Sequence, residues 1–141
     1  MSKIFWDSML FIHLVEDHPT YAPVVRELLG RCFRREDALY TSHLSIAETL
    51  VGLAPGSGKE SVFLSTVEDM GFIFVDFGGS AVKPFRALRR DFGVKPPDAM
   101  NLACASATGV EMYITGDQQL LKKHLHVPGV HFIADFERTP L

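Results

Sequence analysis

The stretch Val110–Asp117, VEMYITGD, changes character abruptly near its end. Its apolar residues 112–114 predict a short buried strand, and the Thr-Gly-Asp sequence that follows predicts a turn. A helical pattern then resumes at Gln118. The strand therefore ends in a carboxylate on a glycine-containing turn. Taken singly, Asp117 is best explained as the N-cap of the next helix, so its meaning depends on whether other acids lie in equivalent places.

Short apolar strands alternate with helices along the rest of the chain. Strands are expected at about 3–6, 38–41, 72–77, 112–114 and 131–134, and the run FIFVDF at 72–77 is the most strand-like. Helices are expected at about 8–17, 22–35, 45–53, 59–70, 80–91, 98–108 and 118–124, with Ser8 and Ser45 at the start of the first and third. This order predicts one α/β domain, residues 1–141, whose mostly parallel sheet of four or five strands carries helices on both faces.

The composition is that of a globular protein, with 47% hydrophobic and 22% charged residues among 141. No apolar run approaches the roughly 20 residues of a membrane helix, and the N-terminus lacks the features of a signal peptide. We therefore expect a cytoplasmic protein without a membrane partner, in which Cys32 and Cys104 are buried thiols. The net charge of −3 argues weakly against a nucleic-acid partner, but acids gathered around a metal would reverse that inference.

Four acids fall where a parallel sheet would bring them together. Asp7 follows the first strand, Glu48 lies in the first turn of the helix after the second, Asp98 begins the helix after Pro96-Pro97, and Asp117 follows the fourth strand. Ligands of such sheets gather beyond the carboxyl ends of the strands. Converging carboxylates repel one another unless a cation is present, and Mg²⁺ prefers oxygen ligands. The pattern indicates metal-assisted hydrolysis of a phosphodiester.

Three of these acids also have a structural explanation. Asp98 at a helix start favours the helix dipole, Asp117 is a possible cap, and Glu48 stands three residues after Ser45, the spacing of a capping box. Asp7 differs, because a charged residue between KIFW and MLFI sits in apolar company. The functional hypothesis rests on the four acids together.

The segments KIFWDS, TSHLSIAETLVGL, VKPPDAMNLACASATG and MYITGDQQLLK resemble, in order and spacing, the four conserved blocks of PIN-domain proteins. The resemblance is greatest to the VapC-type toxins of toxin–antitoxin pairs and covers nearly the whole chain. It implies a ribonuclease that uses Mg²⁺ or Mn²⁺, forms a homodimer and is inhibited by a cognate antitoxin. Trp6, bulkier than the usual aliphatic residue before the first acid, is expected in the core. Carried over by position, the catalytic and metal-binding acids are Asp7, Glu48, Asp98 and Asp117.

The same resemblance assigns supporting roles near the acids. Thr115 and Ser8 match hydroxyl residues that position the carboxylates, and Asn101 would contact the site through its amide without being a ligand. Water attack on phosphorus would leave a 5′-phosphate and a 3′-hydroxyl. Two arginine groups are candidates for RNA contact, although solvated helix faces explain them as well: Arg31, Arg34 and Arg35, and Arg86, Arg89 and Arg90.

Other functions remain open from the sequence. A receiver-like phosphoacceptor domain that binds Mg²⁺ would use Asp76, after FIFV, but it also wants an acid pair after the first strand and a lysine after the last. The chain could instead be a PIN nuclease that processes RNA without being a toxin, or a protein that only binds RNA or a partner. The segment GSGKES at 56–61 lacks the residues of a phosphate-binding loop and is expected to connect two helices.

Overall fold

The computed structural model describes residues 1–141, in which strands and helices alternate along most of the chain. The strands are β1 (Lys3–Trp6), β2 (Ala38–Thr41), β3 (Ile73–Phe74), β4 (Val110–Thr115) and β5 (Val130–Asp135). The helices are α1 (Ser8–Val15), α2 (Tyr21–Arg34), α3 (His43–Leu50), α4 (Gly58–Asp69), α5 (Val82–Phe92), α6 (Pro96–Thr108) and α7 (Gln118–Leu121), with a 3₁₀ turn at Gly79–Ala81. The predicted α/β fold is confirmed.

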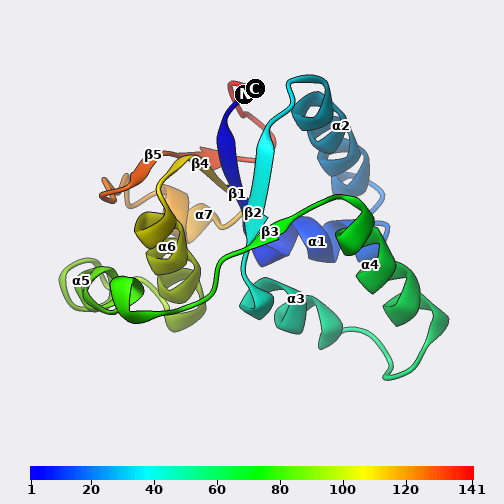
Figure 1. Cartoon of the computed structure of the whole chain (residues 1–141), viewed down its shortest axis with the longest axis horizontal. Helices are drawn as coiled ribbons and strands as arrows, with labels where there is room; N and C mark the ends of the chain where they lie inside the picture. Colours follow the sequence, from blue (N-terminus) through cyan, green and yellow to red (C-terminus); the bar gives the residue numbers. More distant parts are fainter.

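The five strands form one parallel sheet in the order β3-β2-β1-β4-β5. β1 lies at the centre, with Phe5 opposite Tyr40 of β2 on one side and opposite Tyr113 of β4 on the other. Figure 1 shows β1 and β2 side by side, both directed toward α1 and α3. Because all strands run the same way, their carboxyl ends open on one edge of the sheet, where residues that follow the strands meet.

A hydrophobic core lies on each face of the sheet. Ile4 and Trp6 belong to the core with α1, α2 and α4, whereas Phe5 and Tyr113 belong to the core with α5 and α6. These helices lie on opposite sides of the strands in Figure 1. Side chains alternate between faces along a strand, and burial on both faces explains why residues 4–6 of β1 are all apolar. Trp6 is fully buried against Phe11, as expected.

The third strand is much shorter than the sequence predicts. The expected strand at 72–77 is wrong beyond the two residues Ile73 and Phe74, which pair with Tyr40 and Thr41. The chain leaves the sheet because Asp76 turns toward the start of α3, where its carboxylate accepts the backbone N–H of His43 at 2.9 Å. As β3 is an edge strand, it has no second neighbour to hold it in the sheet.

The N-caps of two helices lie earlier in the chain than the sequence predicts. Asp7, not Ser8, is the N-cap of α1, and Ser42, not Ser45, is the N-cap of α3. The Ser42 side chain accepts the backbone N–H of Ser45, so the expected capping box between Ser45 and Glu48 is wrong. The capping box cannot form because Ser45 already lies inside the helix.

No helix is both long and apolar enough to cross a membrane.

Candidate metal and nuclease site

Asp7 is held at the end of β1 by hydrogen bonds from three directions. Its Oδ2 accepts the Thr115 hydroxyl at 2.8 Å, and its Oδ1 accepts the backbone N–H of Ser8 at 2.7 Å and the Asn101 amide at 3.3 Å. The side chain is only 4% exposed. Burial raises the pKa of Asp7 although these hydrogen bonds oppose the shift. The site thus contains a carboxylate whose position is fixed but whose charge is poorly compensated.

Asn101 connects this carboxylate to the start of α3. It is 1% exposed, and its amide nitrogen donates to Ser45 Oγ at 3.1 Å as well as to Asp7. Its amide oxygen accepts the Ser42 hydroxyl. Sequence reasoning placed Asn101 near the site but missed Ser42 and treated Ser45 only as a cap. The two serines at the end of a strand were the available signal, since buried hydroxyls require partners.

Glu48 lies near the Asp7 carboxylate, in the second turn of α3. This is one turn later than predicted, because the helix begins at His43. Burial and the charge of Asp7 raise the pKa of Glu48, and a hydrogen bond with the Ser8 side chain opposes that shift. No capping box engages the Glu48 side chain. The structural explanation that the sequence offered for this acid is therefore removed.

Asp98 and Asp117 form a carboxyl pair on the far side of Asp7. Asp98 lies in the first turn of α6, and Asp117 follows β4. Burial, a hydrogen bond with Asp117 and the charges of Asp7, Asp117 and Glu48 raise the pKa of Asp98 to about 8. Burial disfavours the Asp117 carboxylate, but hydrogen bonds from Asp98, Leu120 and Gln119 outweigh it and lower its pKa. The two shifts are opposite in direction because the protonated form of Asp98 and the ionised form of Asp117 stabilise each other.

Asp117 also caps α7, as one interpretation of the sequence predicted. Its Oδ1 accepts the backbone N–H groups of Gln119 at 2.9 Å and Leu120 at 3.2 Å. Its own N–H donates to the Thr115 hydroxyl at 3.1 Å. Capping and pairing with Asp98 therefore coexist, because the cap bonds fix the side chain beside α6.

The glycine between Thr115 and Asp117 is required by packing. A Cβ atom on Gly116 would stand 2.7 Å from Met9 Sδ and 2.9 Å from Phe136 Cε1. The turn after β4 thus passes too close to α1 and to the C-terminal segment for any side chain. This close approach holds the Asp117 backbone against the end of β1, where Asp7 begins α1.

The four acids suit a hard divalent cation. All offer anionic oxygens. Burial is the main cause of the raised pKa values of Asp7, Glu48 and Asp98, and neighbouring carboxylates add to the shift for Glu48 and Asp98. As the side chains stand, no three Asp, Glu, His or Cys residues are close enough to hold one ion. An ion at this edge would thus have one or two carboxylate ligands and several waters, which is the coordination Mg²⁺ prefers.

A polar cleft of about 390 Å³ opens beside the Asp98–Asp117 pair. It lies between the beginning of α6 and the segment that contains α7. Besides the two acids, three lysines line it: Lys95, Lys122 and Lys123. Sequence reasoning missed these lysines because Lys95 lies far along the chain from Lys122 and Lys123, whereas it singled out arginines that form clusters.

The structure does not bring the first arginine group to the acids. Arg31, Arg34 and Arg35 lie at the end of α2, which leads into the amino end of β2, the opposite edge of the sheet (Figure 1). Arg35 pairs there with Asp37 at 3.0 Å. The second group lies along α5, where Arg89 donates to the Val94 backbone oxygen at 3.0 Å, while Arg86 and Arg90 are exposed.

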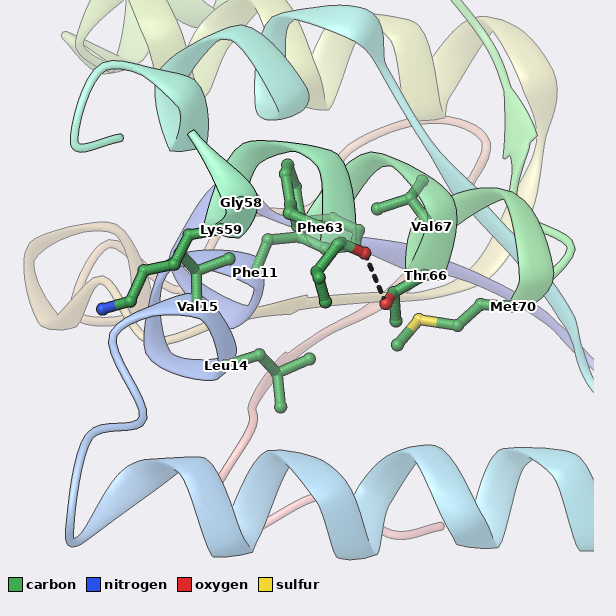
Figure 2. A pocket seen from close by; sticks show the side chains of 10 residues that line it. Phe11, Leu14, Val15, Gly58, Lys59, Phe63, Thr66, Val67 and Met70 are labelled. Carbon is green, nitrogen blue, oxygen red and sulfur yellow. Dashed lines mark hydrogen bonds between the residues drawn. The ribbon is translucent and has the colours of Figure 1, made fainter. Parts of the chain in front are cut away.

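An apolar cavity lies elsewhere, between α1 and α4, and has a volume of about 330 Å³. Figure 2 shows its lining side chains, with Phe63, Val67 and Met70 on α4 and Leu14 and Val15 on α1. Val62, at its edge, is 66% exposed. The cavity offers no titratable group except Lys59, so it suits an apolar partner rather than hydrolysis.

The receiver-like alternative does not fit the fold. Asp76 follows an edge strand, and its carboxylate is engaged by His43, with 2.6 Å between Asp76 Oδ2 and His43 Nδ1. Receiver-type sheets have the order 2-1-3-4-5, in which the third strand is central. Here the order is β3-β2-β1-β4-β5, so the strand before Asp76 is displaced to the edge.

Comparisons with known proteins agree with this architecture. The fold is similar to that of a chain in the crystal structure of VapBC2 from Rickettsia felis bound to a DNA fragment from its promoter, with a TM-score of 0.69, 14% identity, and 94% of this chain and 98% of that chain covered. It is also similar to a chain in a toxin–antitoxin complex from Klebsiella pneumoniae, with a TM-score of 0.65, 22% identity, and 90% and 94% covered. No curated protein matches the sequence. The family model described as PIN domain matches residues 4–124, and the chain therefore belongs to the PIN domain family.

Proposed function

We propose that this chain is a metal-dependent endoribonuclease and the toxin of a toxin–antitoxin pair. The observation that carries the proposal is the convergence of the acids at one edge of the sheet, where Asp98 and Asp117 line the same cleft. Asp7 and Glu48 stand close enough for their charges to act on Asp98. Such a constellation serves catalysis better than stability, because uncompensated like charges weaken the fold.

The chain's own residues divide the work. Asp7, Asp98 and Asp117 would hold Mg²⁺ or Mn²⁺, directly or through water, and Glu48 would complete the set. The ion would supply an activated water and stabilise charge that develops on the phosphate. Thr115, Ser8 and Asn101 keep Asp7 oriented through the hydrogen bonds described above.

Glu48 is the proposed proton acceptor. The pKa of Glu48 is raised toward neutral pH, which makes its carboxylate a better proton acceptor. The side chain is half-buried, and no helix cap engages it. It would accept a proton from the water that attacks phosphorus. The bond that breaks is then the one between phosphorus and the 3′-oxygen, which leaves a 5′-phosphate and a 3′-hydroxyl. Attack by the ribose 2′-hydroxyl would instead leave a cyclic phosphate.

The direct test is cleavage of purified single-stranded RNA with Mn²⁺ or Mg²⁺, with the termini mapped. We expect wild-type protein to cut and Asp98→Ala to be inactive, with the far-UV circular dichroism of the two unchanged. Cleavage that survives chelation of divalent ions, or products ending in a cyclic phosphate, would refute the mechanism. Full activity in Asp98→Ala would refute the site.

The toxin role and the antitoxin partner are supported by the architecture of the two similar structures, which are toxin–antitoxin complexes. We propose the apolar groove between α1 and α4 as the docking place of an amphipathic antitoxin helix. A chain that leaves this groove along α1 reaches Ser8, beside Asp7. A small open reading frame next to the gene, encoding a DNA-binding head, would identify the antitoxin.

Co-expression of the chain with the protein encoded by the neighbouring gene tests the docking. Val62→Asp should prevent co-purification, because it places a charge at the edge of the apolar groove. Arg34→Gln, at the edge of the sheet opposite the acids, should not. If expression of the wild-type chain is harmless and no antitoxin gene lies beside it, the alternative is favoured, a PIN nuclease of RNA processing.

A homodimer is also proposed, and light scattering on the purified protein tests it. The buried thiols of Cys32 and Cys104 support a cytoplasmic location.

A further inference from the structure

We propose that Lys95 and Lys122 bind consecutive phosphates of the RNA strand and guide it along the cleft to the Asp98–Asp117 pair. This inference rests on the proposed nuclease function and assigns the substrate-binding residues of the same site. The cleft named above is lined by three lysines and two acidic residues, so basic side chains outnumber acidic ones even beside the acids. A lysine of this cleft can bind a phosphate only if its ammonium group has no partner within the chain.

The two lysines have no partner within the chain. Neither the Lys95 nor the Lys122 ammonium group makes a hydrogen bond or an ion pair, although the charge of Lys95 reaches Asp117. Lys123 differs, because its Nζ donates to the Phe92 backbone oxygen at 3.0 Å and thereby caps α5. Lys95 and Lys122 are both exposed, so a phosphate can approach them without desolvating buried charge.

The backbone at this place is poorly suited to bind phosphate by itself. A helix N-terminus usually offers free N–H groups to an anion. Here α6 begins with Pro96 and Pro97, which have no N–H, and the Ala99 N–H already donates to the Lys95 carbonyl oxygen at 2.8 Å. The start of α6 therefore offers fewer backbone donors than an ordinary helix N-terminus, and the lysine ammonium groups are the positively charged donors of the cleft. Lys95 precedes α6 and Lys122 ends α7, so they stand on the two walls of the cleft.

The placement explains how an acidic site meets a polyanion. Lys95 lies one helical turn before Asp98, and Lys122 lies five residues after Asp117. Each acid of the pair thus has a cation on its own segment, and both cations line the same cleft. A strand held by both lysines would present its next phosphate to the carboxylates and their cation. The clustered arginines at the end of α2 lie at the other edge of the sheet and would have no part in this path.

The test measures binding of a fluorescein-labelled single-stranded RNA of mixed sequence as a function of salt, in a Glu48→Gln background that prevents cleavage and leaves the cleft lining unchanged. We expect Lys95→Gln and Lys122→Gln each to reduce the slope of log affinity against log salt by about 0.7, equivalent to about a fivefold loss of affinity at 0.1 M salt. Arg34→Gln removes the same charge from an exposed residue at the opposite edge and is expected to leave the slope unchanged.

The outcomes separate this inference from the proposed function. If native protein cleaves RNA but the lysine variants bind with the wild-type slope, or Arg34→Gln changes it instead, the lysine path is wrong and the nuclease assignment stands. If native protein neither binds nor cleaves RNA, both proposals fail. A reduced slope in the lysine variants, with unchanged thermal stability, establishes direct phosphate contacts.

Discussion

The Thr115 hydroxyl donates a hydrogen bond of 2.8 Å to Asp7 Oδ2 and accepts one of 3.1 Å from the Asp117 backbone N–H. One side chain thus joins the ends of β1 and β4 and relates two of the proposed metal-binding acids. It is fully buried, so neither bond can be replaced by bulk water. The relative position of Asp7 and Asp117 depends on this hydroxyl.

Replacing Thr115 by valine should therefore destabilise the protein and impair cleavage. The change keeps the side-chain shape but leaves a buried carboxylate oxygen and an N–H group without their partner, at a cost of about 1–3 kcal/mol. Urea unfolding measures the loss. Thr115→Ser, which retains the hydroxyl, is the matched control and should keep most activity. A valine variant as stable and active as wild type would show that the hydroxyl does not position the acids.

The Asp98–Asp117 pair predicts an unusual pH dependence of the protein without metal. Burial and the neighbouring carboxyl groups raise the pKa of Asp98 to about 8, above the value near 3.9 expected for an unfolded chain. Its contribution to stability is thus complete below pH 4 and is lost as the pH rises toward 8. Asp98→Asn should flatten this decline and exceed wild type in stability near pH 8, as thermal melts in a chelator would show.

Adding Mn²⁺ near pH 8 should make wild type more stable than Asp98→Asn. A cation that binds the carboxylates stabilises the folded state by mass action and removes the penalty of ionising Asp98. Wild type is therefore expected to gain melting temperature with metal, and Asp98→Asn to gain much less. Equal gains in the two proteins would place the cation elsewhere.

Gly116 and Gly58 offer a matched pair of glycine substitutions. Gly116→Ala would press a methyl group against Met9 and Phe136, and overpacking of this kind costs about 1–3 kcal/mol. Gly58 begins α4 with open space around it, so Gly58→Ala should be neutral or slightly stabilising. Chemical unfolding compares them, and similar stabilities of the two variants would show that the turn after β4 tolerates a side chain.

The contact between His43 and Asp76 should contribute to stability with the opposite pH sign. Burial disfavours the Asp76 carboxylate, but the backbone and ring hydrogen bonds of His43 outweigh it and lower its pKa. Its stabilising effect is therefore present above about pH 4, the ordinary range of an aspartate, and fades at lower pH. Asp76→Asn should destabilise modestly at pH 7 and little at pH 3. A difference that persists unchanged at pH 3 would rule out an ionic contribution.

The sequence by itself determined the alternation of strands and helices and the position of Asp7 and Asp117 just after two of the strands. Those predictions succeeded where a local signal was sufficient: the apolar residues 4–6 of β1, the glycine that ends α5 and the double proline at the start of α6. The apolar run at 72–77 misled because hydrophobicity does not reveal whether a strand has one neighbour or two. Ser45 misled because Ser42, three residues earlier, caps the same helix.

Tertiary structure alone decided which charged groups meet. The sheet order puts β1 between β2 and β4, so Asp7, the Ser42–Asn101 network and Asp117 become neighbours although they lie far apart in the chain. It also separates the arginines of α2 from the acids and brings scattered lysines into the cleft. Helix and strand periodicity arises from neighbours along the chain, whereas charge complementarity depends on distances through space that only the packed fold sets.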